Sequence, residues 1–253
     1  MPTFKITLAY DGTDFIGWQR QATGTSVQGL LEDALRALDD RDVTVHGAGR
    51  TDAGVHALGQ VASFSLARDV SADVVRRALN AQLPGAVRVL SAEAALDDFH
   101  ARFSARGKTY RYRIWNADVA DPFERRQAWH VYGALDVVAM QAAARLIEGS
   151  RDFAAFQGPR TEIKSTVRNV ATSTLRNEEC GVRIGEGGRL LVYEVTGDGF
   201  LRHMVRTIVG TLVEIGRGRK PVDWMNDVIA SRDRAAAGQT APAEGLFLVT
   251  VHY

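Results

Sequence analysis

An arginine and a carboxylate lie two residues apart in a glycine-rich stretch of this chain. Arg50 and Asp52 are flanked by Gly47, Gly49 and Gly54. Glycine tolerates positive φ and lets a ligand approach the backbone closely, so this spacing predicts a loop that presents both charged side chains. An ionised carboxylate there can act as a nucleophile, a general base or a metal ligand. A turn that only ends a strand, with the Asp as its cap, explains the same residues without any chemistry.

The residues around Asp52 favour a chemical role. Strands are predicted at 43–45 and 60–66, and the connection between them is longer than a simple turn needs. His46 and His56 are close to Asp52 in the sequence, so a His–Asp hydrolytic pair is considered, although no Gly-x-Ser-x-Gly element, phosphate-binding loop or dinucleotide fingerprint accompanies it. A metal-dependent hydrolase is disfavoured because Asp52 is the only carboxylate in the motif, whereas such sites gather several ligands.

The elements that must position this loop follow from hydrophobic periodicity and helix caps. Alternating apolar residues predict strands, and apolar residues at helical spacing after a capping residue predict helices. The further predicted strands are 4–10, 87–92, 109–115, 165–176, 190–196 and 246–251. The predicted helices begin after Ser26, Ser71 and Asp136, cover 200–216, and include a short one opened by Pro221. This mixture is an α+β pattern, and the basic connection near residues 100–108 predicts two domains, 1–105 and 106–253.

Length and composition are those of a globular protein. The chain has 253 residues, of which 45% are hydrophobic and 24% charged, enough for a full core and for two domains. The single cysteine, Cys180, precludes an internal disulfide and suits a reducing compartment, and no Cys/His spacing resembles a zinc site. Residues 1–6 lack a signal-peptide core and no apolar run is long enough to span a bilayer, so a cytoplasmic protein without membrane contact is predicted.

Basic residues are clustered although the net charge is only +1. Two solvated faces would account for the clusters, and so would an RNA-binding surface. Arg202 and Arg206 are four apart on the predicted helix 200–216 and are expected on one helix face. One cluster contains Arg102, Arg106, Lys108, Arg111 and Arg113, and the other contains Arg202, Arg206, Arg217, Arg219 and Lys220 against Glu214 alone.

Aromatic residues alternate with arginines in the predicted strand 109–115. Tyr110 and Tyr112 face one side of such a strand, and Arg111 and Arg113 face the other. This arrangement is compatible with base stacking beside phosphate contacts. A strand with one aromatic core face and one hydrated basic face explains it equally well. The aromatic residues in the loop after the Asp11–Gly12 turn, Phe15 and Trp18, are modest evidence for a ligand surface.

The chain resembles the tRNA pseudouridine synthase A family. Residues 49–57, which read GRTDAGVHA, look like the family signature. The resemblance covers nearly the whole chain, and the stretch from Asn177 to Gly188 carries no match. The other stretches that resemble family motifs, in the same order, are Tyr10–Thr13 with Gly17–Gln19, Lys108–Tyr112, Phe153–Phe156, Phe200–Arg206 and Gly245–Leu248.

The resemblance implies an isomerase that breaks the glycosidic bond of a uridine in tRNA, turns the base and rejoins it through carbon 5. The implied substrates are uridines 38, 39 and 40 of the anticodon stem-loop, with neither cofactor nor metal. The implied fold is two α+β domains that share an extended, mainly antiparallel sheet flanked by helices. A basic active-site cleft lies at their junction in this family, and a homodimer offers tRNA both subunits.

The resemblance also assigns roles to five residues. Asp52 matches the catalytic aspartate, and Arg206 matches the arginine that pairs with it. Tyr110 matches the tyrosine that stacks on the target base, and Leu246 matches a residue that forms an apolar wall of the pocket. Arg50 matches the arginine that fills the space left by the flipped base. Attack of Asp52 on carbon 6 of the base or on carbon 1′ of the ribose stays open at this point. The alternative function, that of a non-catalytic RNA-binding protein that uses the same cleft, also stays open.

Overall fold

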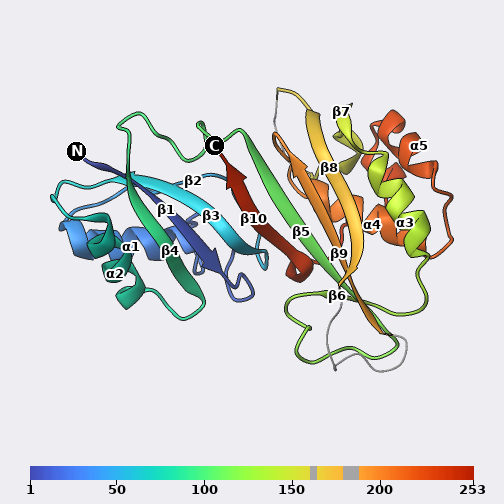
Figure 1. Cartoon of the computed structure of the whole chain (residues 1–253), viewed down its shortest axis with the longest axis horizontal. Helices are drawn as coiled ribbons and strands as arrows, with labels where there is room; N and C mark the ends of the chain where they lie inside the picture. Colours follow the sequence, from blue (N-terminus) through green and yellow to red (C-terminus); the bar gives the residue numbers. More distant parts are fainter. Residues whose placement is uncertain (160–163, 179–187) are drawn as a thin grey trace. The chain divides into compact units, whose positions relative to one another are not determined.

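The computed structural model describes residues 1–159, 164–178 and 188–253. They cluster into two compact units (Figure 1): unit 1 consists of Met1–Arg106 with Phe247–Tyr253, and unit 2 consists of Gly107–Leu246. Residues 247–253 thus group with unit 1, whereas the sequence pattern predicts them in the second domain, 106–253. Cys180 and most of the stretch from Asn177 to Gly188 lie outside the described residues.

Unit 1 is built on a sheet with the strand order β4-β1-β3-β10. β1 (Thr3–Tyr10) lies between β3 (His56–Ser65) and β4 (Val87–Ala95) and is antiparallel to both. β2 (His46–Gly47) pairs with β3, and β10 (Leu246–His252) runs parallel to β3, with Phe247 opposite His56. This parallel pairing is the reason that the last strand groups with unit 1.

Two capped helices cover this sheet, as predicted. α1 (Val27–Asp39) begins at Ser26, whose hydroxyl accepts a hydrogen bond from the Gly29 N–H at 3.2 Å. α2 (Ala72–Gln82) begins at Ser71, which accepts one from the Val74 N–H at 3.4 Å. The two helices contact each other, and α2 packs on β4 (Figure 1). Their apolar faces join the strands in a core that includes the buried side chains Phe4, Ile6, Leu8, Leu31, Leu35, Phe64 and Leu79.

Unit 2 contains an antiparallel sheet with the order β5-β9-β8-β7. Its strands are β5 (Gly107–Asn116), β9 (Arg189–Gly197), β8 (Val167–Glu178) and β7 (Gly149–Asp152). The short β6 (Trp129–Val131) pairs parallel with β5. Tyr112 and Tyr193 lie opposite each other on β5 and β9, and both side chains are fully buried. One face of β5 therefore belongs to the core of unit 2.

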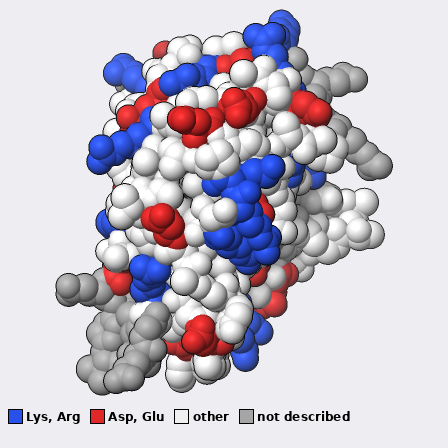
Figure 2. All heavy atoms as spheres, turned by 90° about the vertical axis from the view of Figure 1, so that its right-hand side faces the viewer, with Lys and Arg blue, Asp and Glu red and all other residues white. Residues whose placement is uncertain are grey.

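Three helices accompany the sheet of unit 2. α3 (Val137–Arg145) begins at Asp136, whose carboxylate accepts a hydrogen bond from the Ala139 N–H at 2.9 Å. It packs on β8 and on α4 (Met204–Gly216), and α5 (Trp224–Ser231) packs near β7 (Figure 1). The described part of unit 2 also contains three 3₁₀ turns, at Ala154–Phe156, Arg234–Ala236 and Ala243–Gly245. On the side of unit 2 that carries α5, Figure 2 shows Lys and Arg gathered near the middle, with acidic groups around them.

The α+β class is confirmed, with ten strands and five α-helices in the described residues. The strand predicted at 43–45 is wrong, because the short strand in this region is β2 at His46–Gly47. Val45 is instead bound by side chains of α1: its C=O accepts a hydrogen bond from Gln28, and its N–H donates one to Glu32. These side-chain contacts take the place of a strand ladder.

The helix predicted to begin at 200 begins at Met204. His203 adopts the left-handed conformation, with φ of 63°, which no α-helix continues through. Arg202 therefore lies in the turn before α4, and the prediction that Arg202 and Arg206 share one helix face is wrong. No helix of the described residues combines the length and the apolar composition required to cross a bilayer.

Candidate active site

The Asp52 loop connects β2 to β3 in unit 1 and consists of residues 48–55. Its charged side chains differ in exposure: Arg50 is exposed, Asp52 is half-buried, and Thr51 between them is buried. The buried residue fixes the loop to unit 1, while its two neighbours reach solvent. The structure thus places Arg50 and Asp52 as the spacing predicts, on one loop that presents both.

A second segment of unit 1 supports the backbone of this loop. Gly17 and Asp52 form an isolated antiparallel bridge, and the Trp18 N–H donates to the Thr51 C=O at 3.0 Å. Gly17 has φ of +111°, and a Cβ on it would lie 2.6 Å from the Thr51 carbonyl oxygen. Only glycine satisfies both conditions, so this position brings the two segments close enough to pair.

Buried polar side chains hold the loop from beneath. The Tyr10 hydroxyl lies 2.8 Å from the Thr51 hydroxyl, and the Gln60 side-chain amide donates to the Gly49 C=O at 2.8 Å. Gln60 is fully buried. Burial raises the pKa of Tyr10 to about 12, so its hydroxyl is neutral at physiological pH. Every polar group in this support is hydrogen-bonded, which favours one loop conformation.

His56 serves the structure of unit 1. It is 2% exposed, and its ring stacks on Phe247 with centroids 4.6 Å apart. Its Nδ1 accepts a hydrogen bond from the Gly12 N–H at 3.0 Å and lies 3.1 Å from the Asp11 carboxylate. The His56 ring is therefore held against the turn after β1, next to Asp11.

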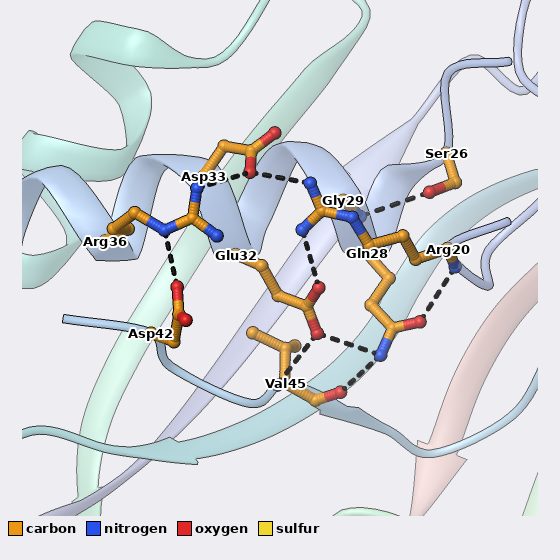
Figure 3. A network of polar contacts seen from close by, with 9 residues as sticks. All are labelled: Arg20, Ser26, Gln28, Gly29, Glu32, Asp33, Arg36, Asp42 and Val45. Atoms are coloured by element: carbon orange, nitrogen blue, oxygen red, sulfur yellow. Dashed lines mark hydrogen bonds and ion pairs between the residues drawn. The ribbon is translucent and has the colours of Figure 1, made fainter. Parts of the chain in front are cut away.

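Helix α1 connects the two segments that border the loop (Figure 3). Glu32 accepts hydrogen bonds from the Val45 N–H at 3.4 Å and from the Arg20 guanidinium at 3.0 Å. Gln28 donates to the Val45 C=O at 3.0 Å and accepts from the Arg20 N–H at 2.9 Å. Val45 leads into the Asp52 loop, and Arg20 follows the segment that pairs with it. One helix thus sets the position of both.

The aromatic residues of the loop after β1 are part of the core. Phe15 is 8% exposed and Trp18 is 3% exposed, with the Trp18 ring 6.3 Å from that of Tyr10. The sequence pattern predicts these side chains at a ligand surface, and the structure buries both of them. The Trp18 ring packs against Gly47, directly before the Asp52 loop.

Three of the candidate residues lie in unit 2. Tyr110 on β5 is buried, and its ring meets the Phe200 ring edge-on at 5.0 Å. Arg206, in the first turn of α4, is half-buried and donates from Nε to the Ala241 C=O at 2.7 Å. Leu246, at the start of β10, is 7% exposed. Tyr110 and Leu246 are thus buried, and Arg206 is bound to the backbone of the segment that leads to Leu246.

The segment before Leu246 is fixed by the core of unit 2. The Tyr112 hydroxyl donates to the Pro242 C=O at 2.7 Å. Burial raises the pKa of Tyr112 well above its ordinary value, and the Glu244 carboxylate adds to this effect while Arg206 opposes it. Tyr112 therefore remains a neutral donor, and with Arg206 it holds the chain from Ala241 to Leu246.

Much of the basic character predicted for β5 is neutralised within unit 2. Arg111 forms an ion pair with Glu194 at 3.0 Å, and Arg113 forms one with Glu124 at 2.9 Å. The basic face of this strand is thus largely paired with acids. In the second cluster, Arg217 and Arg219 both pair with Glu214.

Gln28, Glu32 and Gln60 support the loop but were not singled out from the sequence. Gln60 carries a detectable signal, because a glutamine within an apolar strand pattern needs buried hydrogen-bond partners. Gln28 and Glu32 lie on the polar side of an amphipathic helix, where no pattern distinguishes them from solvated residues. Among the described residues, no group of three or more His, Cys, Asp or Glu side chains is placed to hold a metal ion.

The fold and the Asp52 loop define an α+β enzyme that presents a carboxylate and an arginine on a backbone fixed from three sides. A family model described as tRNA pseudouridine synthase matches residues 6–104 and 143–253. The chain belongs to the tRNA pseudouridine synthase family, an isomerase family.

Similar proteins cover the full length of the chain. It is 43% identical to tRNA pseudouridine synthase A of Myxococcus xanthus over 253 residues, which are all of this chain and 92% of that protein. It is 44% identical over 254 residues to the protein of the same name from Rhodospirillum centenum, with both chains fully covered. It is 47% identical to that of Chloroflexus aurantiacus, over all of this chain and 89% of the relative.

Proposed function

We propose that this protein converts uridine to pseudouridine at positions 38–40 of the anticodon stem-loop of tRNA, with Asp52 as the nucleophile. One observation carries the proposal: a half-buried carboxylate on a loop whose backbone is held by neighbouring segments, in a chain of this family. Because neighbouring segments hold the main chain, the carboxylate can be aimed at a bound base with little loss of conformational freedom.

The reaction is balanced without a co-reactant. The bond between ribose carbon 1′ and N1 of uracil breaks, and a bond from carbon 1′ to carbon 5 forms. The hydrogen on carbon 5 is lost, and N1 gains a proton. A carboxylate nucleophile divides this difficult step into two easier ones, either by attack on carbon 6 of the base or by attack on carbon 1′ of the ribose.

A uridine inside a stem must first leave the base stack, at a cost of roughly a few kcal/mol. In the proposed mechanism the Tyr110 ring stacks on the extruded base, which offsets about 1–3 kcal/mol. Arg50 occupies the vacated space, and its exposure on the loop supports this role. Leu246 forms an apolar wall for the base.

Arg206 is proposed as the cation that keeps Asp52 ionised while the base excludes water from the carboxylate. Its Nε is bound to the Ala241 C=O, and this contact orients the guanidinium. We further propose that the protein acts in the cytoplasm as a homodimer, with both subunits contacting one tRNA. A monomeric mass in sedimentation, with full activity, would overturn the dimer.

The deciding experiment is nucleotide-resolution mapping of pseudouridine in an unmodified tRNA transcript incubated with the protein. Chemical derivatisation that adds mass only to pseudouridine is expected to mark one or more of positions 38–40. A protein that binds the transcript and leaves every uridine unchanged is a non-catalytic RNA-binding protein, and the proposal fails. Modification confined to other positions would keep the activity and overturn the assigned site.

A further inference from the structure

Unit 1 carries a row of three aromatic rings outside the Asp52 loop. The His46 and His100 rings lie 4.6 Å apart, and the His100 and Phe103 rings lie 4.4 Å apart, with interplanar angles of 34° and 35°. Phe103, at the outer end of the row, is 78% exposed. The row therefore ends in a large aromatic surface that is open to solvent.

Hydrogen bonds hold the middle ring and the turn that carries Phe103. The segment His100–Ser104 is a closed turn, in which the Ser104 N–H donates to the His100 C=O at 2.9 Å. The His100 Nδ1 accepts from the N–H groups of Arg102 at 3.1 Å and Phe103 at 3.4 Å. The His100 ring is thus fixed by its own turn, and the turn that carries Phe103 is formed without a ligand.

Ser63 of β3 aligns the turn with the inner ring. Its hydroxyl accepts a hydrogen bond from the Ala101 N–H at 3.0 Å, and its backbone lies opposite His46 in the pairing of β2 with β3. The Tyr253 hydroxyl fixes the other side of the turn by donating to the Ala101 C=O at 2.7 Å. The three rings thus come from two segments that meet at one strand residue.

The charge around the row suits a nucleotide. Burial lowers the pKa of His100, and the charges of His46 and Arg102 act in the same direction, so the middle ring is neutral at physiological pH. The Arg102 guanidinium lies 5.8 Å from the centre of the exposed Phe103 ring, which places a cation beside the stacking surface. Two acidic residues, Asp97 and Asp98, precede Phe99 and the turn in the sequence.

We propose that Phe103 stacks on an unpaired base of the RNA substrate, with Arg102 at the adjoining phosphate. This inference rests on the proposed function, because it takes the RNA to be the tRNA that is modified. A base has a flat π face that continues a row of rings, and an arginine beside an aromatic platform is the usual companion of single-stranded RNA contacts. The site is a second contact, separate from the five residues of the candidate active site.

The test compares Phe103→Ala with Leu96→Ala in the full-length protein. Leu96 is 79% exposed in the same segment, so its truncation removes a similar apolar surface without a ring. Affinity for an unmodified tRNA transcript is measured in the Asp52→Asn background, and kcat and KM are measured in the active protein. Phe103→Ala is expected to weaken binding about tenfold and to raise KM with little change in kcat. Leu96→Ala is expected to leave Kd, KM and kcat unchanged.

A ring-preserving variant separates stacking from folding. Phe103→Tyr keeps the aromatic face and is expected to restore the affinity that Phe103→Ala loses. Equal Kd and KM for wild type, Phe103→Ala and Leu96→Ala would overturn the stacking contact while pseudouridine formation stands. A lower sedimentation mass of Phe103→Ala with unchanged tRNA affinity would assign the ring to a protein–protein contact and overturn it as well. If wild type binds tRNA through Phe103 but forms no pseudouridine, the proposed function fails and the contact stands.

Discussion

The backbone of Asp52 pairs with that of Gly17, so the candidate nucleophile is held by a residue from the turn region after β1. The same region contains Gly12, whose N–H binds His56 just after the loop. Changes in this region should alter the Asp52 loop although none of its side chains is proposed to touch substrate.

Gly12→Ala is expected to destabilise unit 1 and reduce activity. A Cβ at this position would lie 2.0 Å from the Val55 carbonyl oxygen, so the loop backbone must shift, at a cost of roughly 1–3 kcal/mol. Urea unfolding and pseudouridine formation measure both effects. Gly85→Ala is the matched control, because the nearest atom to its added Cβ lies 4.0 Å away. Equal stability of the two variants would contradict the close packing of the turn on the loop.

Asp52→Asn is expected to lower turnover by a factor on the order of 10⁴ or more, because the amide keeps the shape and loses the nucleophilic oxygen. Affinity for tRNA should persist or rise slightly, since a negative charge leaves the RNA-binding region. Asp42→Asn removes the same charge from an exposed position of unit 1 and should retain full turnover. Substantial pseudouridine formation by Asp52→Asn, with deamidation excluded by mass spectrometry, would remove Asp52 from the central role.

Arg50→Ala is expected to leave the melting temperature unchanged and to slow modification of tRNA by roughly tenfold, or about 1.4 kcal/mol in the barrier. The proposed role of Arg50 is to fill the space of the flipped base, so the defect should shrink on a short single-stranded uridine substrate. Arg77→Ala, on an exposed part of α2, serves as the charge control. An equal defect on both substrates would instead assign Arg50 to the chemical step.

Tyr110→Phe is expected to retain most of the activity, and Tyr110→Ala is expected to lose at least tenfold. The proposed role needs the ring, which is worth about 1–3 kcal/mol when stacked on a base. Tyr132→Ala, which removes an exposed tyrosine of unit 2, should have no effect. The measurement is kcat/KM on a tRNA transcript for all three variants. If Tyr110→Phe is as impaired as Tyr110→Ala, the hydroxyl and not the face of the ring is required.

Asp39 is expected to make the stability of unit 1 depend on acid pH. Burial opposes its ionisation, but the N–H groups of Ala67 and Arg68 and the Arg41 guanidinium outweigh burial and hold the pKa of Asp39 below its ordinary value. The stabilisation is therefore complete above the unfolded pKa of about 3.9 and is lost as the pH falls through the lower folded pKa.

The measurement is the urea midpoint of wild type and Asp39→Asn at pH 7 and at successively lower pH. The variant is expected to be less stable by about 1–3 kcal/mol at pH 7, because the amide leaves buried N–H groups poorly satisfied. The difference should narrow in acid, where the wild-type carboxylate also becomes neutral. A constant difference at every pH would mean that the charge of Asp39 contributes nothing.

Local signals predicted the secondary structure well where a cap or a strict period was present. Ser26, Ser71 and Asp136 each cap the helix predicted after them, and the predicted strands 4–10 and 109–115 correspond to β1 and β5. The helix predicted from 200 begins at Met204, because the apolar spacing extends back to Leu201 but does not reveal the left-handed conformation of His203.

The candidate site was predicted in part. The presentation of Arg50 and Asp52 follows from local glycine spacing, and the structure agrees. The support of the loop by Gln60, by α1 and by Gly17 depends on contacts between segments far apart in the chain, which no single stretch encodes. The roles of Tyr110, Arg206 and Leu246 came from the family resemblance and stay predictions.

The parallel pairing of β10 with β3 has a consequence for synthesis on the ribosome. Phe247–Tyr253 complete unit 1: β10 pairs with β3 at Phe247 and Leu248, the Arg106 N–H donates to the His252 C=O, and the Tyr253 hydroxyl fixes Ala101. During synthesis, residues 1–106 leave the ribosome long before residues 247–253 have been translated. Unit 1 therefore reaches its final form only after unit 2 has emerged from the exit tunnel, and a ribosome that stalls within unit 2 leaves the carboxylate loop without its complete scaffold.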